Sequence, residues 1–208
     1  PVYRNTELVF YKEAYLGLEA QLEALSQARK FIFMEYHAIE DRQSFGEIKE
    51  ILRKKAEEGV EVRLFYDDVG SIGFIDPKFV QELEEWGIQC RIFNPIVPMV
   101  NLFMNNRDHR KITVVDGQIG FTGGYNLADE YFNIHSPYGY WKDTGIRLRG
   151  EAVGTLTLLF LEMWHAMDDS PVRGLYNYLP RHWDRYTGQG YCAPYAYAPT
   201  DGFPLGED

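Results

Sequence analysis

The chain has 208 residues, a formal net charge of −10, and a hydrophobic fraction of 45% that includes many aromatic residues. This length and apolar content suffice to bury a sizeable core in one large domain. The acidic balance argues against a general nucleic-acid binder, because such proteins usually present a basic surface to the phosphate backbone. We therefore expect no nucleic acid among the partners.

Targeting signals and cysteines are uninformative in this sequence. No apolar run reaches the length of a membrane-spanning helix, and the first residues lack the pattern of a signal peptide. The two cysteines, Cys90 and Cys192, do not form a disulfide framework or a zinc-binding spacing. A reducing compartment is the simpler interpretation, with Cys90 as a small buried hydrophobe.

The first half of the chain alternates between helical and extended patterns. Three helices are expected, over residues 13–29, 44–58 and from Asp76-Pro77 to Gly87. Three strands are expected between and after them, over residues 30–36, 60–66 and 88–93. Repeated strand–helix–strand units imply parallel neighbours in one sheet. The predicted fold class is α/β, a mixed, largely parallel sheet flanked by helices on both faces.

The pattern changes after residue 93. Residues 94–106 contain two prolines and many apolar side chains. They suit either insertion at a membrane surface or, as we favour, a packed loop or a contact surface. A last strand is expected over 144–149 and an amphipathic helix over 151–167. Residues 168–208 are rich in Pro, Gly and Tyr, and are expected to form an extended linker.

The segment from His109 to Asn126 carries the candidate chemistry. Residues 112–115 are β-branched and predict a strand, and Asp116-Gly117 favours a hairpin turn. Residues 119–122 then return as the partner strand. Gly123-Gly124 end that strand, and Asn126 is expected to cap a short helix.

Alternation along a strand would place His109 and Lys111 in one pocket, about 7 Å apart, with Arg110 facing the other way. A nearby cation lowers the pKa of an imidazole, and a neutral imidazole is a usable nucleophile. Lys111 could also neutralise a phosphate oxygen, and Gly123 and Gly124 could bring backbone N–H groups close to an anion. These parts suit phosphoryl or phosphatidyl transfer without a metal or cofactor. A His-x-Lys pair alone usually indicates a solvated edge of a sheet. The catalytic hypothesis therefore rests on the full spacing of the segment.

That spacing, H-x-K-x4-D-x6-G-G followed by Asn126, resembles the HKD motif of the phospholipase D superfamily at every defining position. Similarity to the bacterial cardiolipin synthases extends over most of residues 7–167. It is clearest in four segments: residues 57–71, 105–111, 141–144 and 147–150. The resemblance implies a phospholipase D-like domain over residues 1–167, and a linker over 168–208 toward a second half.

The resemblance also implies roles and a reaction. His109 would form a phosphohistidine intermediate, Lys111 and Asn126 would bind phosphate, and Asp116 would support the site. The reaction would join two phosphatidylglycerol molecules into cardiolipin and release glycerol. The expected partners are phosphatidylglycerol and an anionic membrane, with the domain on the cytoplasmic side of a bacterial cell membrane.

One departure limits the inference. The family uses two HKD motifs, whereas this sequence contains one. The resemblance therefore implies the first catalytic half of a longer protein, inactive by itself unless a second copy supplies the other histidine, because the leaving group needs a general acid. The alternatives are a homodimeric phospholipase D-type hydrolase or nuclease, and a non-catalytic lipid-binding module. The acidic net charge argues against a nuclease, and the intact motif argues against a non-catalytic module.

Overall fold

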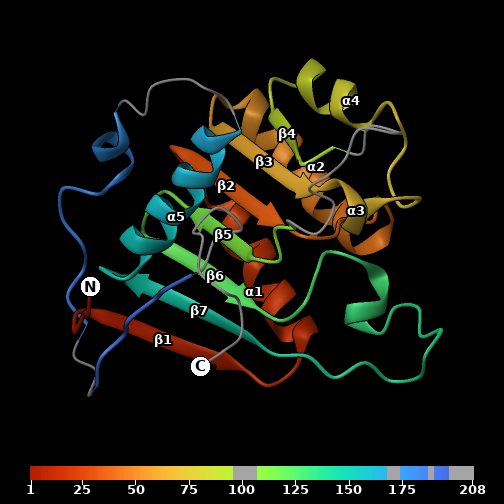
Figure 1. The fold of residues 1–208 in the computed structure, drawn as a ribbon. Helices are drawn as coiled ribbons and strands as arrows, with labels where there is room; N and C mark the ends of the chain where they lie inside the picture. The colour runs from red at the N-terminus through yellow and green to blue at the C-terminus, as the bar shows by residue number, and fades with distance from the viewer. Residues whose placement is uncertain (96–106, 168–173, 187–189, 197–208) are drawn as a thin grey trace.

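The computed structural model describes residues 1–95, 107–167, 174–186 and 190–196, and within them the chain forms one seven-stranded sheet (Figure 1). The strand order is β1-β7-β6-β5-β2-β3-β4. The strands are β1 (Thr6–Tyr11), β2 (Phe31–Tyr36), β3 (Glu61–Asp67), β4 (Gln89–Phe93), β5 (Lys111–Val115), β6 (Ile119–Gly123) and β7 (Gly145–Gly150).

Strand pairing divides the sheet into two parts. The pairs β2–β3 and β3–β4 are parallel. The remaining pairs, β2–β5, β5–β6, β6–β7 and β7–β1, are antiparallel. The mixed α/β class is confirmed, but parallel pairing is less extensive than the sequence suggested. The Asp116-Gly117 turn sends β6 back beside β5, and β7 and β1 then continue the antiparallel half.

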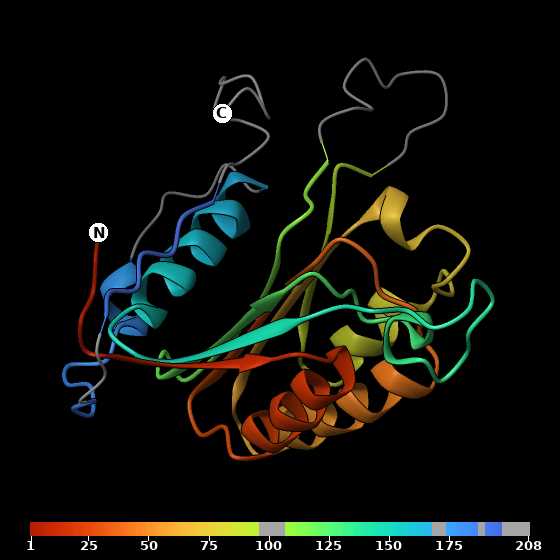
Figure 2. The same ribbon diagram turned by 90° about the horizontal axis from the view of Figure 1, so that it is seen from below.

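Helices cover both faces of the sheet, as expected (Figure 2). One face carries α1 (Ala14–Ser26), α2 (Gln43–Glu57) and α4 (Phe79–Glu85), whose buried residues form one core cluster with the sheet. The other face carries α5 (Val153–Ala166), which forms a second cluster. The short elements are α3 (Asp68–Ser71) and the 3-10 helices η1 (Asp129–Phe132) and η2 (Leu175–Tyr178).

Strand β2 lies between the two cores. All six of its residues are buried. Phe31 and Phe33 pack on the α5 side, whereas Ile32 and Met34 pack on the α1–α2 side. Burial on both faces explains why β2 has a nearly continuous apolar sequence instead of an alternating one.

The short helices α3 and η2 were not expected from the sequence, and two further elements differ from the expectations. Strand β1 was not anticipated, although its β-branched and aromatic residues suit an extended chain. Helix α4 begins at Phe79, later than expected, because Asp76 and Pro77 form a turn in which the Asp76 carboxylate accepts a 2.8 Å hydrogen bond from the Lys78 N–H. Cys90 is buried, as expected, and burial raises the pKa of its thiol to about 12.

The described parts of the expected linker lie against the domain. Tyr3 and Cys192 exchange two backbone hydrogen bonds of 2.8 Å. The Tyr178 hydroxyl accepts a 2.7 Å hydrogen bond from Arg63 of β3. The boundary after residue 167 stays a prediction, and residues 96–106, considered above for membrane insertion, lie outside the described residues. In the described ranges no helix is long and apolar enough to cross a bilayer.

The α5 core makes a stability prediction. The Phe160 ring is fully buried and stacks on Phe33 with centroids 4.6 Å apart. Phe160→Ala should lower the free energy of unfolding by about 3–5 kcal/mol in urea denaturation, because it leaves a cavity between α5 and β2. Leu158→Ala, at a partly exposed position of the same helix, should change stability by less than about 0.5 kcal/mol. Equal effects of the two substitutions would contradict this packing.

Candidate active site

The candidate residues gather at one edge of the sheet, where β2, β3 and β6 end and β5 begins. The carboxyl ends of parallel strands are the usual location of ligand sites in open α/β sheets. Here Tyr36 pairs with Lys111 at the end of the β2–β5 ladder, and Asp67 ends β3. The fold therefore gathers segments that are distant in sequence around the start of β5.

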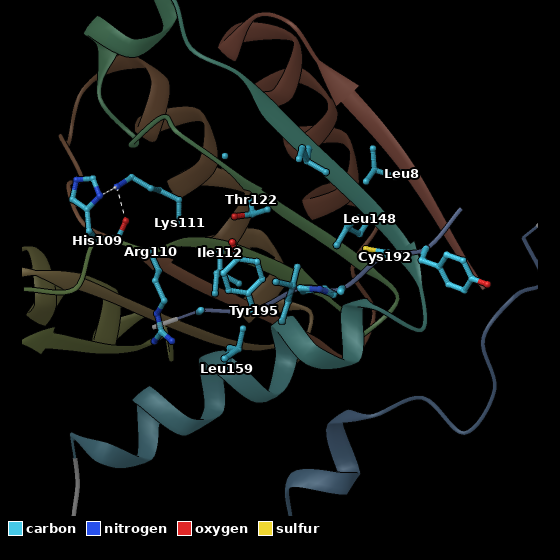
Figure 3. A pocket seen from close by; sticks show the side chains of 17 residues that line it. Leu8, His109, Arg110, Lys111, Ile112, Thr122, Leu148, Leu159, Cys192 and Tyr195 are labelled. Atoms are coloured by element: carbon cyan, nitrogen blue, oxygen red, sulfur yellow. Dashed lines mark hydrogen bonds between the residues drawn. The ribbon is translucent and has the colours of Figure 1, made fainter. Parts of the chain in front are cut away.

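His109 and Lys111 lie together, as the sequence predicted. The Lys111 ammonium nitrogen is 3.1 Å from His109 Nδ1, and it donates a 2.7 Å hydrogen bond to the His109 carbonyl oxygen. Lys111 is buried and is the first residue of β5, whereas His109 is exposed and just precedes the strand. Figure 3 shows the two side chains directed toward one another.

Arg110 points away from this pair, also as predicted (Figure 3). Its Nε lies 2.5 Å from Glu35 Oε1 and 3.3 Å from Asp108 Oδ1. Glu35 is fully buried, and burial followed by the neighbouring Asp108 charge raises the pKa of Glu35 well above its usual value. Arg110 therefore forms ion pairs in the interior next to the site, and these pairs help to hold the start of β5 in place.

The surroundings of His109 favour the neutral form of its imidazole. Partial burial, followed by the charges of Lys111 and His37, lowers the pKa of the His109 imidazole. Burial also lowers the pKa of Lys111, to about 8. The sequence argument anticipated the Lys111 effect but not the larger contribution of burial. A neutral imidazole next to a cation can attack an electrophile, while the cation can stabilise negative charge.

The backbone segment that carries His109 is held by Asp67, which is fully buried. One carboxylate oxygen accepts hydrogen bonds from the N–H groups of Val69 and Gly70 at 3.0 and 3.3 Å. The other accepts a 3.1 Å hydrogen bond from the Asp108 N–H. Asp67 thus joins the end of β3, the helix α3 and the residue preceding His109.

His37 is a site residue that the sequence reasoning missed. It follows β2, and its ring centroid lies 4.8 Å from that of His109. His37 Nδ1 donates a 2.8 Å hydrogen bond to the Asp108 carbonyl oxygen. A Cβ atom on Gly70 would lie 2.2 Å from the His37 carbonyl oxygen and 2.9 Å from His37 Cδ2, so this glycine leaves room for both the backbone and the ring of His37. The available signal was a histidine directly after a wholly buried strand.

Asp116 lies at the other end of β5 from His109, on the order of 20 Å away along an extended chain. Its carboxylate accepts hydrogen bonds from the backbone N–H groups of Arg29, Lys30 and Phe31 at 2.9, 2.7 and 2.9 Å. These bonds attach the start of β2 to the β5–β6 turn. They are consistent with the supporting role proposed for Asp116, which acts on the sheet and not on a reacting atom.

The two glycines serve strand packing. The Gly124 N–H donates to the Thr144 carbonyl oxygen at 3.1 Å, which corrects the expectation that it would point to an anion. A Cβ atom on Gly124 would meet the Asp143 carboxylate at 2.2 Å, and one on Gly123 would meet the Thr144 oxygen at 2.6 Å. Both positions therefore need glycine so that the end of β6 can approach the residues before β7.

Asn126 is buried at the same edge of the sheet. Its side-chain oxygen accepts a 3.1 Å hydrogen bond from the Ala38 N–H, and its amide nitrogen donates a 2.8 Å hydrogen bond to the Tyr131 hydroxyl. The predicted capping role is wrong, because η1 follows Ala128 and has no side-chain cap. Phosphate binding by Asn126 stays a prediction. Within the described residues no group of three or more His, Cys, Asp or Glu side chains could hold a metal ion.

Comparisons with known proteins agree with this arrangement. A family model described as "Cardiolipin synthase, PLD-like domain" matches residues 22–139. A protein of Streptococcus mutans without a characterised function is 40% identical over all 208 residues, which cover 45% of its length. A cardiolipin synthase of Alkalihalophilus pseudofirmus is 43% identical over 155 residues, which are 74% of this chain and 30% of that protein. The chain thus spans less than half of these relatives.

Two solved structures share the fold at low sequence identity. NucT from Helicobacter pylori has a TM-score of 0.58 and 14% identity, over 79% of this chain and 97% of that one. Nuc from Salmonella typhimurium, a phospholipase D family member, has a TM-score of 0.53 and 17% identity, over 80% and 93%. The fold is therefore that of a phospholipase D-like domain. The family match covers more than half of the chain, which belongs to the cardiolipin synthase, PLD-like domain family.

The site makes a prediction about proton affinity. Lys111→Met should raise the pKa of His109, because it removes a neighbouring positive charge. The titration of the His109 Hε1 signal in NMR spectra would measure this shift, and His37→Gln should raise the pKa in the same direction. In the native protein the lowered pKa also makes His109 oppose folding as pH falls below the ordinary histidine range, since the unfolded chain binds the proton more readily. An unchanged pKa in Lys111→Met would contradict the proposed coupling.

Asp116 makes a separate prediction. Asp116→Ala should lower the free energy of unfolding by about 2–3 kcal/mol, because three backbone donors lose a charged acceptor. The backbone of Asp116 has a φ of 54°, which asparagine tolerates better than alanine, so Asp116→Asn should lose less stability. In both variants the pKa of His109 should remain as in the native protein, because the separation exceeds the screening length. A large shift in that pKa would show that Asp116 acts directly on the site.

Proposed function

We propose that this chain is the first catalytic half of a phosphatidyltransferase that makes cardiolipin from two phosphatidylglycerol molecules. The observation that carries the proposal is the 3.1 Å approach of Lys111 Nζ to His109 Nδ1, in a chain of the cardiolipin synthase family. A neutral imidazole and a cation at this spacing suit attack on a phosphodiester.

In the first step, a His109 nitrogen attacks the phosphorus of one phosphatidylglycerol. A phosphorus–nitrogen bond forms, and the bond from phosphorus to the glycerol oxygen breaks. The departing glycerol oxygen takes a proton from a general acid. In the second step, a hydroxyl group of another phosphatidylglycerol attacks the phosphohistidine and gives up its proton, which regenerates His109 and yields cardiolipin.

Lys111 has two successive tasks in this scheme. Its ammonium donates to His109 Nδ1 before substrate arrives, so the neutral imidazole carries its proton on Nε2. An incoming phosphate is a stronger acceptor and draws the ammonium away. Nδ1 can then hold the ring proton, and Nε2 becomes free to attack. Asn126 is proposed as a second phosphate ligand, which requires its amide to exchange one of its present partners.

The general acid is proposed to come from outside this chain, as the histidine of a second HKD motif. The chain covers 30–45% of the relatives' length, which leaves room in such proteins for a second half. In that case the isolated chain needs either this half or a second copy of itself. We further propose that the substrate lies in an anionic membrane and that the domain meets it at the cytoplasmic side of the cell membrane.

The direct test uses phosphatidylglycerol that is radioactively labelled in its terminal glycerol. The longer protein that contains this chain should release labelled glycerol and form cardiolipin. His109→Ala and Lys111→Met should each lower the rate at least about a thousandfold. His182→Ala is a matched control, because His182 contacts the β5–β6 turn region through Gln118, at the far end of the sheet.

The products distinguish the alternatives. Phosphatidic acid in place of cardiolipin would indicate a hydrolase, and cleavage of DNA by a dimer of this chain would indicate a nuclease. Cardiolipin formation that survives His109→Ala would overturn the assignment of the nucleophile. Binding of phosphatidylglycerol without turnover by the longer protein would favour the non-catalytic module.

A further inference from the structure

A groove of about 400 Å³ begins at the candidate active site and runs along the α5 face of the sheet (Figure 3). Its floor is formed by the four strands of the antiparallel half, one wall by α5, and the other wall by the described tail residues around Tyr191–Ala196. The lining side chains at its two ends are different in character. His109, Arg110 and Lys111 lie at one end in Figure 3, and Leu8 and Cys192 at the other.

The part of the groove beyond the basic end is apolar. Its apolar lining residues include Leu8, Ile112, Ile146, Leu148, Leu156 and Leu159. Ile112 and Leu148 also belong to the α5 core, so the groove continues the hydrophobic interior outward to the surface. Leu8 on the edge strand β1 is 53% exposed. Contiguous apolar surface that remains open to water usually marks a binding site.

We propose that this groove holds an acyl chain of the phospholipid whose phosphate reacts at His109 and Lys111. The inference rests on the proposed function and adds to it a location for the lipid tail. Two features favour an amphiphile as the occupant. His109 and Lys111, where the phosphate is proposed to react, line one end of the groove, and the apolar part starts next to them, in the order in which a phospholipid presents its head and chain. The volume is also within the range of small-molecule sites.

The groove further predicts how affinity depends on chain length. Each methylene group that leaves water for an apolar surface strengthens binding by up to about fourfold. Alkyl phosphates with longer chains should therefore bind more tightly until the groove is filled. Chains that extend past Leu8 reach solvent, and there the gain per methylene should stop. A surface that recognised phosphate alone would show no such dependence.

The experiment measures binding of butyl, octyl and dodecyl phosphate to this chain by calorimetry, below the concentrations at which they form micelles. Native protein should bind dodecyl phosphate at least about tenfold more tightly than butyl phosphate. Octyl glucoside, which has a chain but no phosphate, should bind more weakly than octyl phosphate. Equal affinities for butyl and dodecyl phosphate would overturn the proposal.

Two substitutions on β1 form a matched pair. Leu8→Asp places a charge in the groove and should remove most of the gain from dodecyl over butyl phosphate. Phe10→Asp changes a residue of the same strand that is 59% exposed and does not line the groove, so it should leave the gain intact. Equal losses in both variants would indicate non-specific adsorption to β1 and would overturn the proposal.

The outcomes separate this inference from the proposed function. If chain length governs alkyl phosphate binding but the longer protein forms no cardiolipin, then the groove is supported and the phosphatidyltransferase assignment fails. If cardiolipin forms but neither chain length nor Leu8→Asp affects binding, then the assignment is supported and the groove is overturned. If this chain binds dodecyl phosphate but the longer protein does not, then another part of the longer protein fills the groove. That result also overturns the proposal.

Discussion

The antiparallel ladder between β2 and β5 determines the geometry of the whole site. Its register pairs Ile32 with Val115 at one end and Tyr36 with Lys111 at the other. A shift by one residue would exchange the two faces of β5 and move His109 away from His37. The Asp116 carboxylate holds one end of this ladder through three backbone N–H groups. At the other end the same register brings His37 beside His109. The aspartate at one end and the two imidazoles at the other thus depend on the same strand register.

Charge is distributed so that an acidic protein can present a basic site. The net charge of −10 would repel an anionic lipid at long range, but screening limits that repulsion to about a nanometre at physiological salt. Close to the site, Arg110 is paired with Glu35 and Arg107 contacts Asp67, so these cations mainly hold the backbone. Lys111 instead contacts His109. Among these three cations of the described residues, Lys111 is the one whose charge lies beside the imidazole, and its pKa is lowered by burial.

Local patterns in the sequence predicted those parts of the site that depend on neighbouring residues. The His109–Lys111 pair follows from strand alternation, and the β5–β6 hairpin follows from Asp116-Gly117. The sequence could not show contacts that depend on strand register or on distant loops. His37 reaches His109 only through the β2–β5 pairing, and Gly124 is required because Asp143 packs against it. Asn126 looked like a helix cap because the chain around it is polar, yet its oxygen binds the main chain after β2. Strand β1 was missed because its partner β7 is remote in sequence.

That remoteness has a consequence for how the molecule is made. Leu8 pairs with Leu148, and Tyr3 bridges to Cys192, so β1 can join the sheet only after the much later residues of β7 have been synthesised. Contacts between such distant residues form slowly, because the entropy of closing a long loop must be lost before they stabilise the fold. Until then the side chains of Leu8 and Phe10 and the open edge of β7 are exposed, which is a condition that favours aggregation. We therefore expect the addition of β1 to complete the sheet late in folding.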